Sequence, residues 1–331
     1  MHHEREVVVI TGASAGVGRA LVREYAKHKA KIGLIARDPE RLEAAKNEVE
    51  QSGGTALALP CDVADAQKVE EAAERAEREL GPIQIWHNNA MTTILAPLSE
   101  TQPEEFKRAT EVTYLGCVYG TMAALKRMLP RDRGVIVQTS SALGYRSIPL
   151  QAAYCGAKHG IIGFTDSLRC ELIHNKSKVR VTSVCLPGVN TPQFSWCRTR
   201  MPRQPQPVPP IFEPEVPARA LYWAAHHNRR ELYVGGSTVI AINGQKIAPG
   251  IADWYLGTHG YEGQQTSEPV DTSRPGNLFD PVPGNYAARG MFSQRSKDFS
   301  LQTWADLRRV PLGIAAAAAA GLGAFLWKEN A

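Results

Sequence analysis

The chain has 331 residues, of which 43% are hydrophobic and 21% are charged, a composition typical of a globular protein with a large apolar core. Its formal net charge of +5 comes from 38 basic and 33 acidic residues. These are spread along the chain, so the basic blocks of a nucleic-acid-binding protein are missing. The six cysteines form no CxxC pair and no cluster with histidine, which favours reduced thiols in a metal-free cytoplasmic protein. The polar start, residues 1–6, is unlike a signal peptide.

Short apolar runs alternate with helical patterns along most of the chain. In chain order, the expected strands are Val7–Ile10, Lys31–Ala36, Ala56–Leu59, Ile83–Trp86, Val135–Gln138, Val179–Cys185 and Glu231–Val234. The expected helices are Gly18–Lys29, Pro39–Gln51, Ala64–Leu80, Pro103–Leu129 and Tyr154–His174. Strands that are separated by helices form a parallel sheet with right-handed crossovers and helices on both faces. The pattern therefore predicts a doubly wound α/β fold.

The composition shifts after residue 190. Residues 191–217 contain eight prolines, which favours an irregular loop. Beyond Gly260 the chain is rich in Pro, Gly, Ser and Gln, so it is expected to wrap the surface or to be partly disordered. We therefore divide the chain into a catalytic domain (1–245), an irregular C-terminal extension (246–309) and an apolar tail (310–331).

The tail is a candidate membrane anchor. Leu312–Trp327 has 16 residues and no charge, and as a helix it extends about 24 Å, slightly short of the about 30 Å bilayer core. Trp327 is a residue type favoured at the membrane interface. The segment is mostly Ala and Gly, however, so a surface-docked helix or a loose tail is the other interpretation. The expected location is the cytoplasm, with membrane association through this tail.

A glycine-rich turn follows the first expected strand and opens a helix. Glycines suit a tight turn that lets a pyrophosphate approach main-chain N–H groups, and the helix N-terminus adds a partial positive charge. A plain strand-to-helix turn also uses glycine, so the motif alone is weak. The residues expected to bind a dinucleotide here are Gly12, Ser14, Gly16, Val17 and Gly18.

Arg37 follows the second strand, where sites for NAD carry an acidic residue that binds the ribose 2′-hydroxyl. A guanidinium instead suits the 2′-phosphate of NADP, through charge-assisted hydrogen bonds. Ser14 can add a hydroxyl to the same phosphate. The sequence therefore predicts NADP(H) as cofactor, unless Arg37 is only a solvated charge paired with Asp38.

Polar residues also follow the third and fourth strands. Asp62 and Val63 come after the third, where a carboxylate can meet the adenine amino group. Asn88 and Asn89 come after the fourth, where their amides can tie strand ends together beside the cofactor. Both features also fit ordinary turn chemistry at strand ends.

Tyr154 and Lys158 lie four residues apart at the start of a long expected helix, so the phenol and the ammonium share one helical face. A nearby cation favours the phenolate and lowers the pKa of a tyrosine, which is ordinarily about 10. Tyr154 can then exchange a proton with a carbonyl or alcohol as hydride moves to or from a nicotinamide. Ser141, at the end of the fifth strand, can bond the same substrate oxygen, although such a serine is often only a cap.

The TGxxxGxG turn, the Asn-Asn-Ala stretch, Ser141 and the YxxxK pair occur in an order and at spacings that resemble the short-chain dehydrogenase/reductase family. The resemblance covers about Val7–Gly236 and implies a Rossmann-like sheet of about seven strands, a homodimer or homotetramer, and a small-molecule carbonyl or alcohol substrate. It also implies that Tyr154 is the acid/base and that Ser141 orients the substrate. Lys158 would bond the nicotinamide ribose as well as lower the pKa of Tyr154.

The resemblance also assigns cofactor contacts. It places the pyrophosphate on Gly12, Gly16 and Gly18, and Asn88 beside the adenosine ribose. The turn after the sixth strand would meet the nicotinamide amide through Pro187, Gly188 and Val189.

Three residues depart from the family pattern. Thr113 replaces a common asparagine that supports a water-linked proton relay, Met91 replaces a glycine, and Thr191 lies one residue closer to Pro187 than usual. None of these departures removes a reacting group, so the sequence still predicts an enzyme.

The substrate is less defined than the chemistry. Leu143, Tyr145, Leu150, Phe194 and Trp196 belong to segments expected to flank the pocket. An apolar pocket suits a lipophilic ketone, aldehyde or secondary alcohol, with the Pro-rich loop as its lid, but apolar residues also serve simply as core. The alternatives are an epimerase or dehydratase that retains its cofactor, and a non-catalytic NADP-binding regulator.

Overall fold

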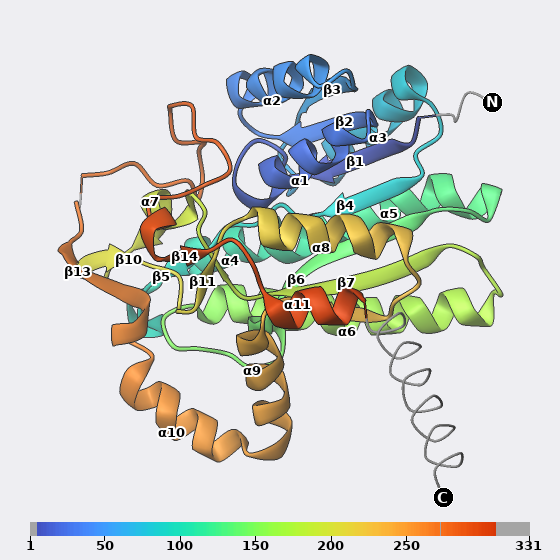
Figure 1. Cartoon of the computed structure of the whole chain (residues 1–331). Coiled ribbons are helices and arrows are strands. Elements are labelled where there is room, and N and C mark those ends of the chain that lie inside the picture. The colour runs from blue at the N-terminus through green and yellow to red at the C-terminus, as the bar shows by residue number, and fades with distance from the viewer. Residues whose placement is uncertain (1–4, 272, 309–331) are drawn as a thin grey trace, which may run out of the picture.

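The computed structural model describes residues 5–271 and 273–308 and has a seven-stranded sheet at its centre (Figure 1). Every neighbouring pair of strands in this sheet is parallel. In spatial order the strands are β12 (Glu231–Tyr233), β7 (Arg180–Leu186), β6 (Val135–Ser141), β4 (Ile85–Asn88), β1 (Val7–Thr11), β2 (Lys31–Ala36) and β3 (Thr55–Pro60). The predicted Rossmann-like fold is confirmed, because the order reverses at β1 and β4 as in doubly wound sheets.

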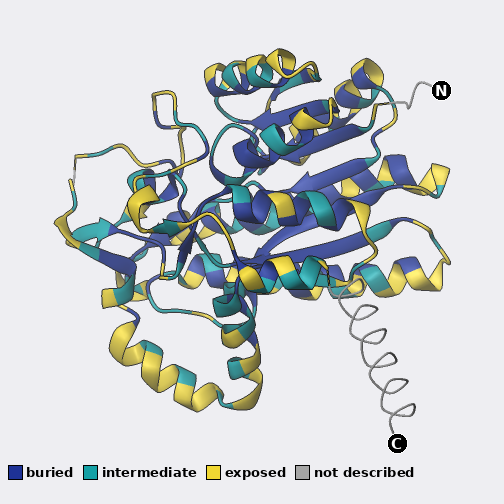
Figure 2. Cartoon of the chain, in the orientation of Figure 1, coloured by how far each residue is buried: buried dark blue, intermediate teal, exposed yellow. Residues whose placement is uncertain are grey.

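Helices cover both faces of the sheet, which is why the strands read as continuous apolar runs rather than as alternating ones. One face packs against α1 (Gly16–Lys27), α2 (Pro39–Gln51) and α8 (Glu215–His226). The other face packs against α3 (Ala66–Leu80), α5 (Gly116–Met128) and α6 (Ala152–His174). Figure 2 shows the sheet as buried and the outer sides of these helices as exposed.

The helix predicted over 103–129 is interrupted. It consists of α4 (Pro103–Thr110), a π-helical turn η2 (Glu111–Leu115) and α5. Single π turns inside helices are often found at functional sites, and this one contains Thr113. The short 3-10 helices elsewhere are η1 (Leu98–Glu100), η3 (Leu129–Arg131), η4 (Ala142–Gly144), η5 (Glu262–Gln264) and η6 (Ser293–Arg295).

Two helices follow the sheet where no helix was expected. They are α9 (Gly236–Ile247) and α10 (Pro249–His259), and they project from the sheet at the lower left of Figure 1. The boundary expected after residue 245 falls inside α9, so the extension and the preceding segment share one helix.

The remainder of the extension is held by short strand pairs and one helix. β13 (Gln265–Pro269) pairs with β10 (Arg203–Pro205), and β14 (Ser296–Lys297) pairs with β11 (Ile211–Phe212). β11 in turn pairs with β8 (Gly188–Val189), and β5 (Ile94–Leu95) pairs with β9 (Arg198–Thr199). The short helix α7 (Gln193–Trp196) lies between β8 and β9 in the chain. α11 (Leu301–Leu307) is the last described helix and packs against α8.

Within residues 5–271 and 273–308, none of the helices combines the length and apolarity needed to cross a bilayer. The candidate anchor at 310–331 lies outside the described residues.

Candidate active site

A cavity of about 460 Å³ lies at the carboxyl ends of the strands and joins the glycine turn to the helix that carries Tyr154. Ligands of doubly wound sheets bind at this edge. The predicted site residues that line the cavity are Gly12, Ser14, Gly16, Val17, Arg37, Asp62, Val63, Ser141, Tyr154, Lys158, Pro187, Gly188 and Val189. Gly18 and Asn88 do not line it.

The glycine turn has the backbone that its motif predicts. Gly12 has φ +68° and Gly16 has φ +58°, which only glycine adopts without strain. Gly18 has a packing role, because a Cβ there would lie 2.0 Å from the carbonyl oxygen of Gly12. The turn and the start of α1 are thus in direct contact. Ala15 caps α1 without a side-chain hydrogen bond, and Gly16 and Val17 at the start of the helix line the cavity, where a helix N-terminus favours an anion.

A segment of the extension, residues 277–290, crosses this end of the cavity, and we call it the strap. Arg37 donates from its terminal nitrogens to the carbonyl oxygens of Asn277 (2.5 Å) and Phe279 (2.6 Å). Gly16 N donates to the carbonyl oxygen of Ala287 at 3.1 Å. The strap thus contacts both the arginine expected to select the cofactor and the turn expected to bind its pyrophosphate.

Two further arginines donate to the strap. Arg41 donates to Val282 O at 3.0 Å and Arg108 donates to Leu278 O at 3.2 Å. Burial lowers the pKa of Arg37, while the Asp62 carboxylate acts in the opposite direction, and a guanidinium stays charged nonetheless. Sequence reasoning missed Arg41 and Arg108. For Arg41 a signal exists, since it follows Arg37 by four residues on the first turn of α2; for Arg108 none does.

Asp62 lines the cavity but its carboxylate is already engaged. It forms an ion pair with Arg108 and accepts a hydrogen bond from Ala64 N at 3.0 Å. An adenine amino group that bonds Asp62 would therefore share the carboxylate with Arg108. Val63 lies beside it as a buried apolar wall residue.

Asn88, which the resemblance places beside the ribose, does not line the cavity. Its amide is buried beneath the cavity, where it accepts from Trp86 Nε1 (2.8 Å) and donates to Thr121 and Gln138 (both 2.9 Å). Asn89 lines the cavity instead, and its amide donates to Thr11 O at 3.1 Å. The structure thus places Asn89, and not Asn88, on the cavity wall, and the assignment of Asn88 to the ribose stays a prediction.

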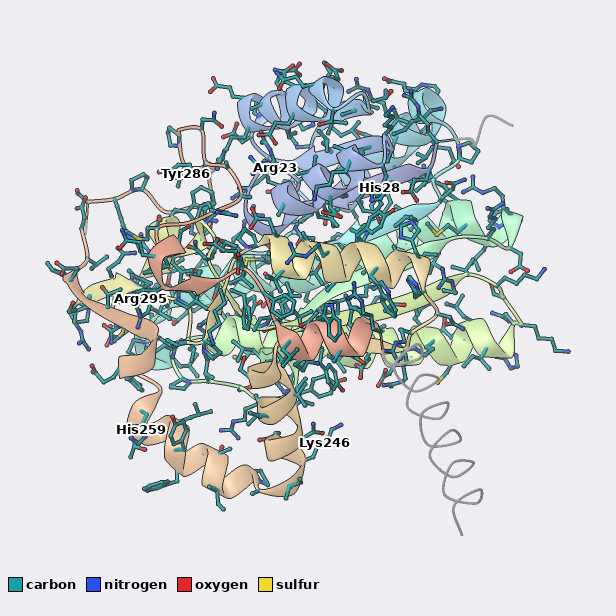
Figure 3. All side chains as sticks on the ribbon, in the orientation of Figure 1. Arg23, His28, Lys246, His259, Tyr286 and Arg295 are labelled. Carbon is teal, nitrogen blue, oxygen red and sulfur yellow. The ribbon has the colours of Figure 1, made fainter. Side chains whose placement is uncertain are left out.

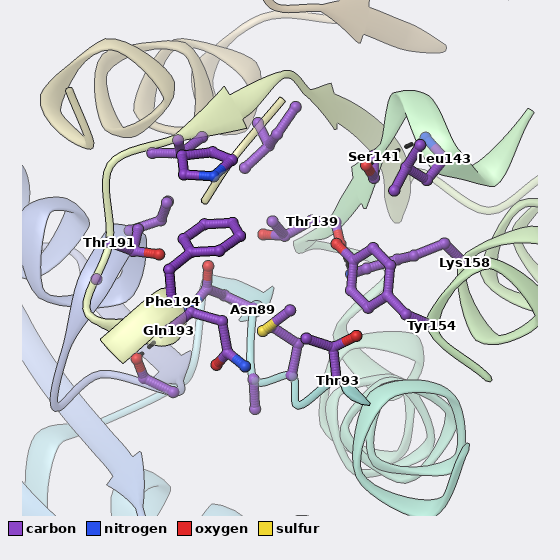
Figure 4. Close-up of a pocket in the computed structure, with 18 of the residues that line it drawn as sticks. Asn89, Thr93, Thr139, Ser141, Leu143, Tyr154, Lys158, Thr191, Gln193 and Phe194 are labelled. Atoms are coloured by element: carbon purple, nitrogen blue, oxygen red, sulfur yellow. Dashed lines mark hydrogen bonds between the residues drawn. The ribbon is translucent and has the colours of Figure 1, made fainter. Parts of the chain in front are cut away.

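The predicted catalytic residues converge at the other end of the cavity. Ser141, Tyr154 and Lys158 lie together there, and Phe194 and Thr191 lie across the cavity from them (Figure 4). Lys158 Nζ is 5.4 Å from the centre of the Tyr154 ring and donates to Thr139 O at 2.6 Å. Ser141 Oγ accepts from Leu143 N at 3.1 Å, so this serine caps η4 as well as facing the cavity.

Burial raises the pKa of Tyr154, and a hydrogen bond with Ser141 offsets only part of that effect. Burial also lowers the pKa of Lys158 to about 8. The expectation that Lys158 brings the pKa of Tyr154 below its ordinary value is wrong for this structure. The reason is that loss of solvation dominates the pKa of this buried phenol, while the Lys158 ammonium bonds Thr139 O.

The three departures from the family pattern are placed differently. Thr113 is fully buried, donates to Thr92 O at 2.9 Å and accepts from Thr92 N at 3.1 Å. It therefore holds the loop after β4 and does not line the cavity. Met91 and Thr191 do line the cavity.

The apolar residues expected around the substrate divide in the same way. Leu143, Phe194 and Trp196 line the cavity, whereas Tyr145 and Leu150 do not. Tyr145 bonds Glu231 through its hydroxyl. Trp196 lies near the strap, with Arg41 5.1 Å above its ring and Tyr286 in edge contact at 4.6 Å. Pro207 and Val208 of the Pro-rich loop complete the wall.

The cavity residues fit a nicotinamide dinucleotide. The glycine turn packs closely on the segment after β4, since a Cβ on Gly12 would lie 2.9 Å from Ala90 Cα, and Gly12 and Gly16 expose their backbone to the cavity. Thr139 Oγ1 beside the predicted catalytic residues, and Gln193 Nε2 beside Asn277 of the strap, are buried cavity atoms without a hydrogen-bond partner among the described residues. Buried polar atoms of this kind ordinarily have partners, so a polar ligand suits them.

Comparison with known proteins agrees with this geometry. Residues 6–200, which include every predicted site residue, match the short chain dehydrogenase family. YxnA, an uncharacterized oxidoreductase of Bacillus subtilis, is 30% identical over 323 residues, which make up 97% of this chain and 89% of that protein. Human 17-beta-hydroxysteroid dehydrogenase 13 is 30% identical over 245 residues, covering 74% of this chain and 79% of the relative. A 3-dehydrosphinganine reductase of Danio rerio is 35% identical over 193 residues, which cover 57% of this chain and 58% of that protein.

Proposed function

The chain belongs to the short-chain dehydrogenase family, and from this premise we propose that it is an NADP(H)-dependent oxidoreductase that interconverts a carbonyl and an alcohol on a lipophilic small molecule. The observation that carries the proposal is the single cavity that joins the glycine turn to Ser141, Tyr154 and Lys158. Oxidoreductases of this kind need a dinucleotide site and a proton-transfer group on one cavity.

The choice of NADP over NAD rests on the charge at the nucleotide end. Arg37 and Arg41 both line the cavity, and guanidinium groups bind a phosphate through forked, charge-assisted hydrogen bonds. Arg37 donates to strap carbonyls, and a 2′-phosphate would offer it a charged acceptor instead. Arg41 donates to a strap carbonyl and to the Asp38 carboxylate. Ser14 lines the same end and supplies a hydroxyl.

The nicotinamide cofactor supplies or accepts the hydride, and the chain's own residues handle the proton. Because burial raises the pKa of Tyr154, its phenol is protonated at neutral pH and donates its proton to the carbonyl oxygen during reduction. Ser141 donates a hydrogen bond to the same oxygen and so fixes its position. Lys158, held by Thr139 O, places a positive charge beside the phenolate that forms.

The substrate class follows from the walls of the cavity. Leu143, Phe194 and Val208 present apolar surface near the reacting groups, and such pockets suit lipophilic ligands. The names of two relatives refer to a hydroxysteroid and to 3-dehydrosphinganine, which are lipophilic molecules. A cytoplasmic homodimer or homotetramer is part of the same proposal, to be checked by light scattering of the full chain.

The test is to follow absorbance at the NADPH band while the full chain is offered a panel of lipophilic ketones and aldehydes. NADPH should be consumed with at least one of them, and NADH should serve less well. NADPH binding without consumption on any carbonyl would favour a regulator. Conversion of a substrate with no net change in NADPH would favour an epimerase or dehydratase.

A further inference from the structure

The α9–α10 hairpin, residues 236–259, leaves an unusual amount of apolar surface in contact with solvent. Of the described side chains, only Thr238 and Ile242 are buried in α9 and none is buried in α10. Helices on a globular protein normally bury their apolar stripe. Figure 2 shows α10 as almost entirely exposed. The large exposed apolar residues are Ile240 (74%), Ile247 (83%), Ile251 (70%), Trp254 (66%) and Tyr255 (55%).

Their spacing gathers these residues on one face of each helix. Ile251, Trp254 and Tyr255 are separated by three and four residues, and Ile240 and Ile247 by seven, which are the spacings of helical neighbours. We call the five residues together the apolar face. Contiguous exposed apolar patches of this kind mark sites of interaction with proteins or membranes.

The hairpin carries few charged residues, which suits contact with a lipid surface better than contact with an acidic protein partner. Between residues 236 and 259 the charged groups are Lys246 and Asp253, apart from His259, and the Asp253 carboxylate accepts from Arg146 at 2.6 Å. Figure 3 labels Lys246 on α9 and His259 at the end of α10. Trp and Tyr are the residue types favoured at the membrane–water interface, and a lysine there interacts with anionic headgroups.

The inner side of the same two helices lines the catalytic cavity. Ser237, Thr238 and Ala241 of α9 and Leu256 of α10 are wall residues. The apolar face and the cavity therefore lie on opposite sides of one helical layer. A lipophilic molecule dissolved in a bilayer under the hairpin would be one helix away from the reacting groups.

The start of α11, the last described helix, contacts the chain at the base of the hairpin. Gly235 N, immediately before α9, donates to Thr303 Oγ1 of α11 at 2.9 Å, and Gln302 Nε2 donates to Tyr233 O at 3.2 Å. After Arg308 the sequence continues into the uncharged run Leu312–Trp327. Two weak attachments on one molecule bind a membrane far better than either alone.

We propose that the apolar face docks on the surface of a lipid bilayer and that the substrate enters the cavity from the lipid. The docking stands on the exposed apolar face alone, whereas the entry of substrate rests on the function proposed above. The apolar face inserts among the headgroups, and α10 separates the lipid from the cavity wall.

The test measures binding of the full chain to vesicles of phosphatidylcholine, with and without phosphatidylglycerol, by flotation. The hairpin variant carries Ile251→Glu and Trp254→Glu. A tail variant carries Leu322→Lys and Phe325→Lys, and a control carries Leu98→Glu, which replaces an equally exposed leucine in η1 (63%). The hairpin variant should partition on the order of tenfold or more weakly, because burial of even one such side chain contributes that much. The control should bind like the unaltered chain.

Brominated phosphatidylcholine gives a second readout. This lipid should quench part of the tryptophan fluorescence of the unaltered chain, and that quenching should be absent in Trp254→Phe. The Trp254→Phe variant keeps an apolar side chain, so it should still float with the vesicles. Equal flotation of the hairpin variant and the unaltered chain would overturn the proposal in favour of the tail. The proposal would also be overturned if, without lipid, a soluble quencher reached Trp254 more readily in the tail variant than in the unaltered chain. That result would mean that the tail covers the apolar face. A dimer that dissociates in the hairpin variant would show that a second copy of the chain is the partner.

Turnover separates this proposal from the proposed function. The hairpin variant should reduce a water-soluble carbonyl as fast as the unaltered chain, and should lose rate only on a carbonyl embedded in vesicles. Absence of NADPH consumption on any carbonyl would contradict the proposed function and leave the flotation result standing. Equal rates on the embedded carbonyl would contradict entry from the lipid.

Discussion

At the nucleotide end of the cavity, Arg37, Arg41 and Gly16 N already donate to carbonyl oxygens of the strap, whereas at the catalytic end Thr139 Oγ1 has no partner among the described residues. A ligand at the first end must therefore replace or share existing hydrogen bonds. A ligand at the second end satisfies a polar atom that burial otherwise leaves at a cost.

Because of this difference, we expect the two ends of the cavity to respond differently to mutation. Changes to Ser141 and Tyr154 act on groups proposed to bond the reacting atoms, so they should lower the rate with little effect on cofactor binding. Changes at the nucleotide end act on groups that exchange one acceptor for another, so they should alter affinity first. The separation of kcat from KM reads this contrast directly.

The largest effect is expected for Tyr154→Phe. Removal of the hydroxyl deletes the proposed proton donor, and loss of a general acid typically costs about a hundredfold to ten-thousandfold in rate. NADPH affinity, measured by fluorescence titration, should stay near normal. A matched control is Tyr145→Phe, which removes a hydroxyl that bonds Glu231 outside the cavity and should keep its rate. Full turnover by Tyr154→Phe would remove the mechanism.

Arg37→Asp should lower NADPH affinity by about tenfold to a hundredfold, because it replaces charge-assisted hydrogen bonds with repulsion of the 2′-phosphate. NADH should gain relative to NADPH, since aspartate accepts from the 2′-hydroxyl. Titration of both cofactors measures the shift, and thermal unfolding checks that the loss of the three hydrogen bonds from Arg37 to the strap has not unfolded the chain. A preference of the unaltered protein for NADH would contradict the NADP assignment.

The pH dependence of carbonyl reduction should follow Lys158. Its pKa is lowered to about 8, so the ammonium is present below that pH and is lost as the pH rises through it. We expect kcat/KM for reduction to fall above pH about 8, by up to about tenfold per pH unit. Lys158→Arg keeps a charged side chain at all these pH values, and its residual activity should lack the decline. A flat profile for the unaltered chain would contradict the role of the ammonium.

Thr113→Val should change the activity least. The hydroxyl bonds only Thr92 in the described structure, so its loss should destabilise the fold by about 1–3 kcal/mol, as measured by urea unfolding. Turnover should fall by far less than the about hundredfold that loss of a general acid costs. A drop as large as that of Tyr154→Phe would place Thr113 in the proton path.

The first two thirds of the fold could be predicted because each element there has a strong local signal. β2 and α2 begin and end at the predicted residues, since apolar runs and Pro39 mark them. The catalytic end was predictable for a related reason: the spacing of Tyr154 and Lys158 within one helix fixes their relative position whatever else the chain does.

The rest could not be predicted, for physical reasons that differ from place to place. The strap binds through main-chain carbonyls, and these have no signature in the side-chain sequence. α10 has no buried stripe, so the usual periodicity of a packed helix is missing. Which of Asn88 and Asn89 lines the cavity depends on how the chain leaves β4, and the direction of the Tyr154 pKa shift depends on burial, and the motifs encode neither.

The pairing of β14 with β11, and of β11 with β8, places residues from the far end of the described chain in one small sheet with Gly188 and Val189 of the cavity wall. This pairing determines whether the N-terminal part of the chain can be separated from the C-terminal part. A chain shortened after β12, the last strand of the large sheet, would lose the β14 partner of β11 and the carbonyl acceptors of Arg37. It is therefore not expected to be a free-standing catalytic unit. The same holds for chimaeras: exchange of the C-terminal third between relatives would exchange part of the cofactor site with it.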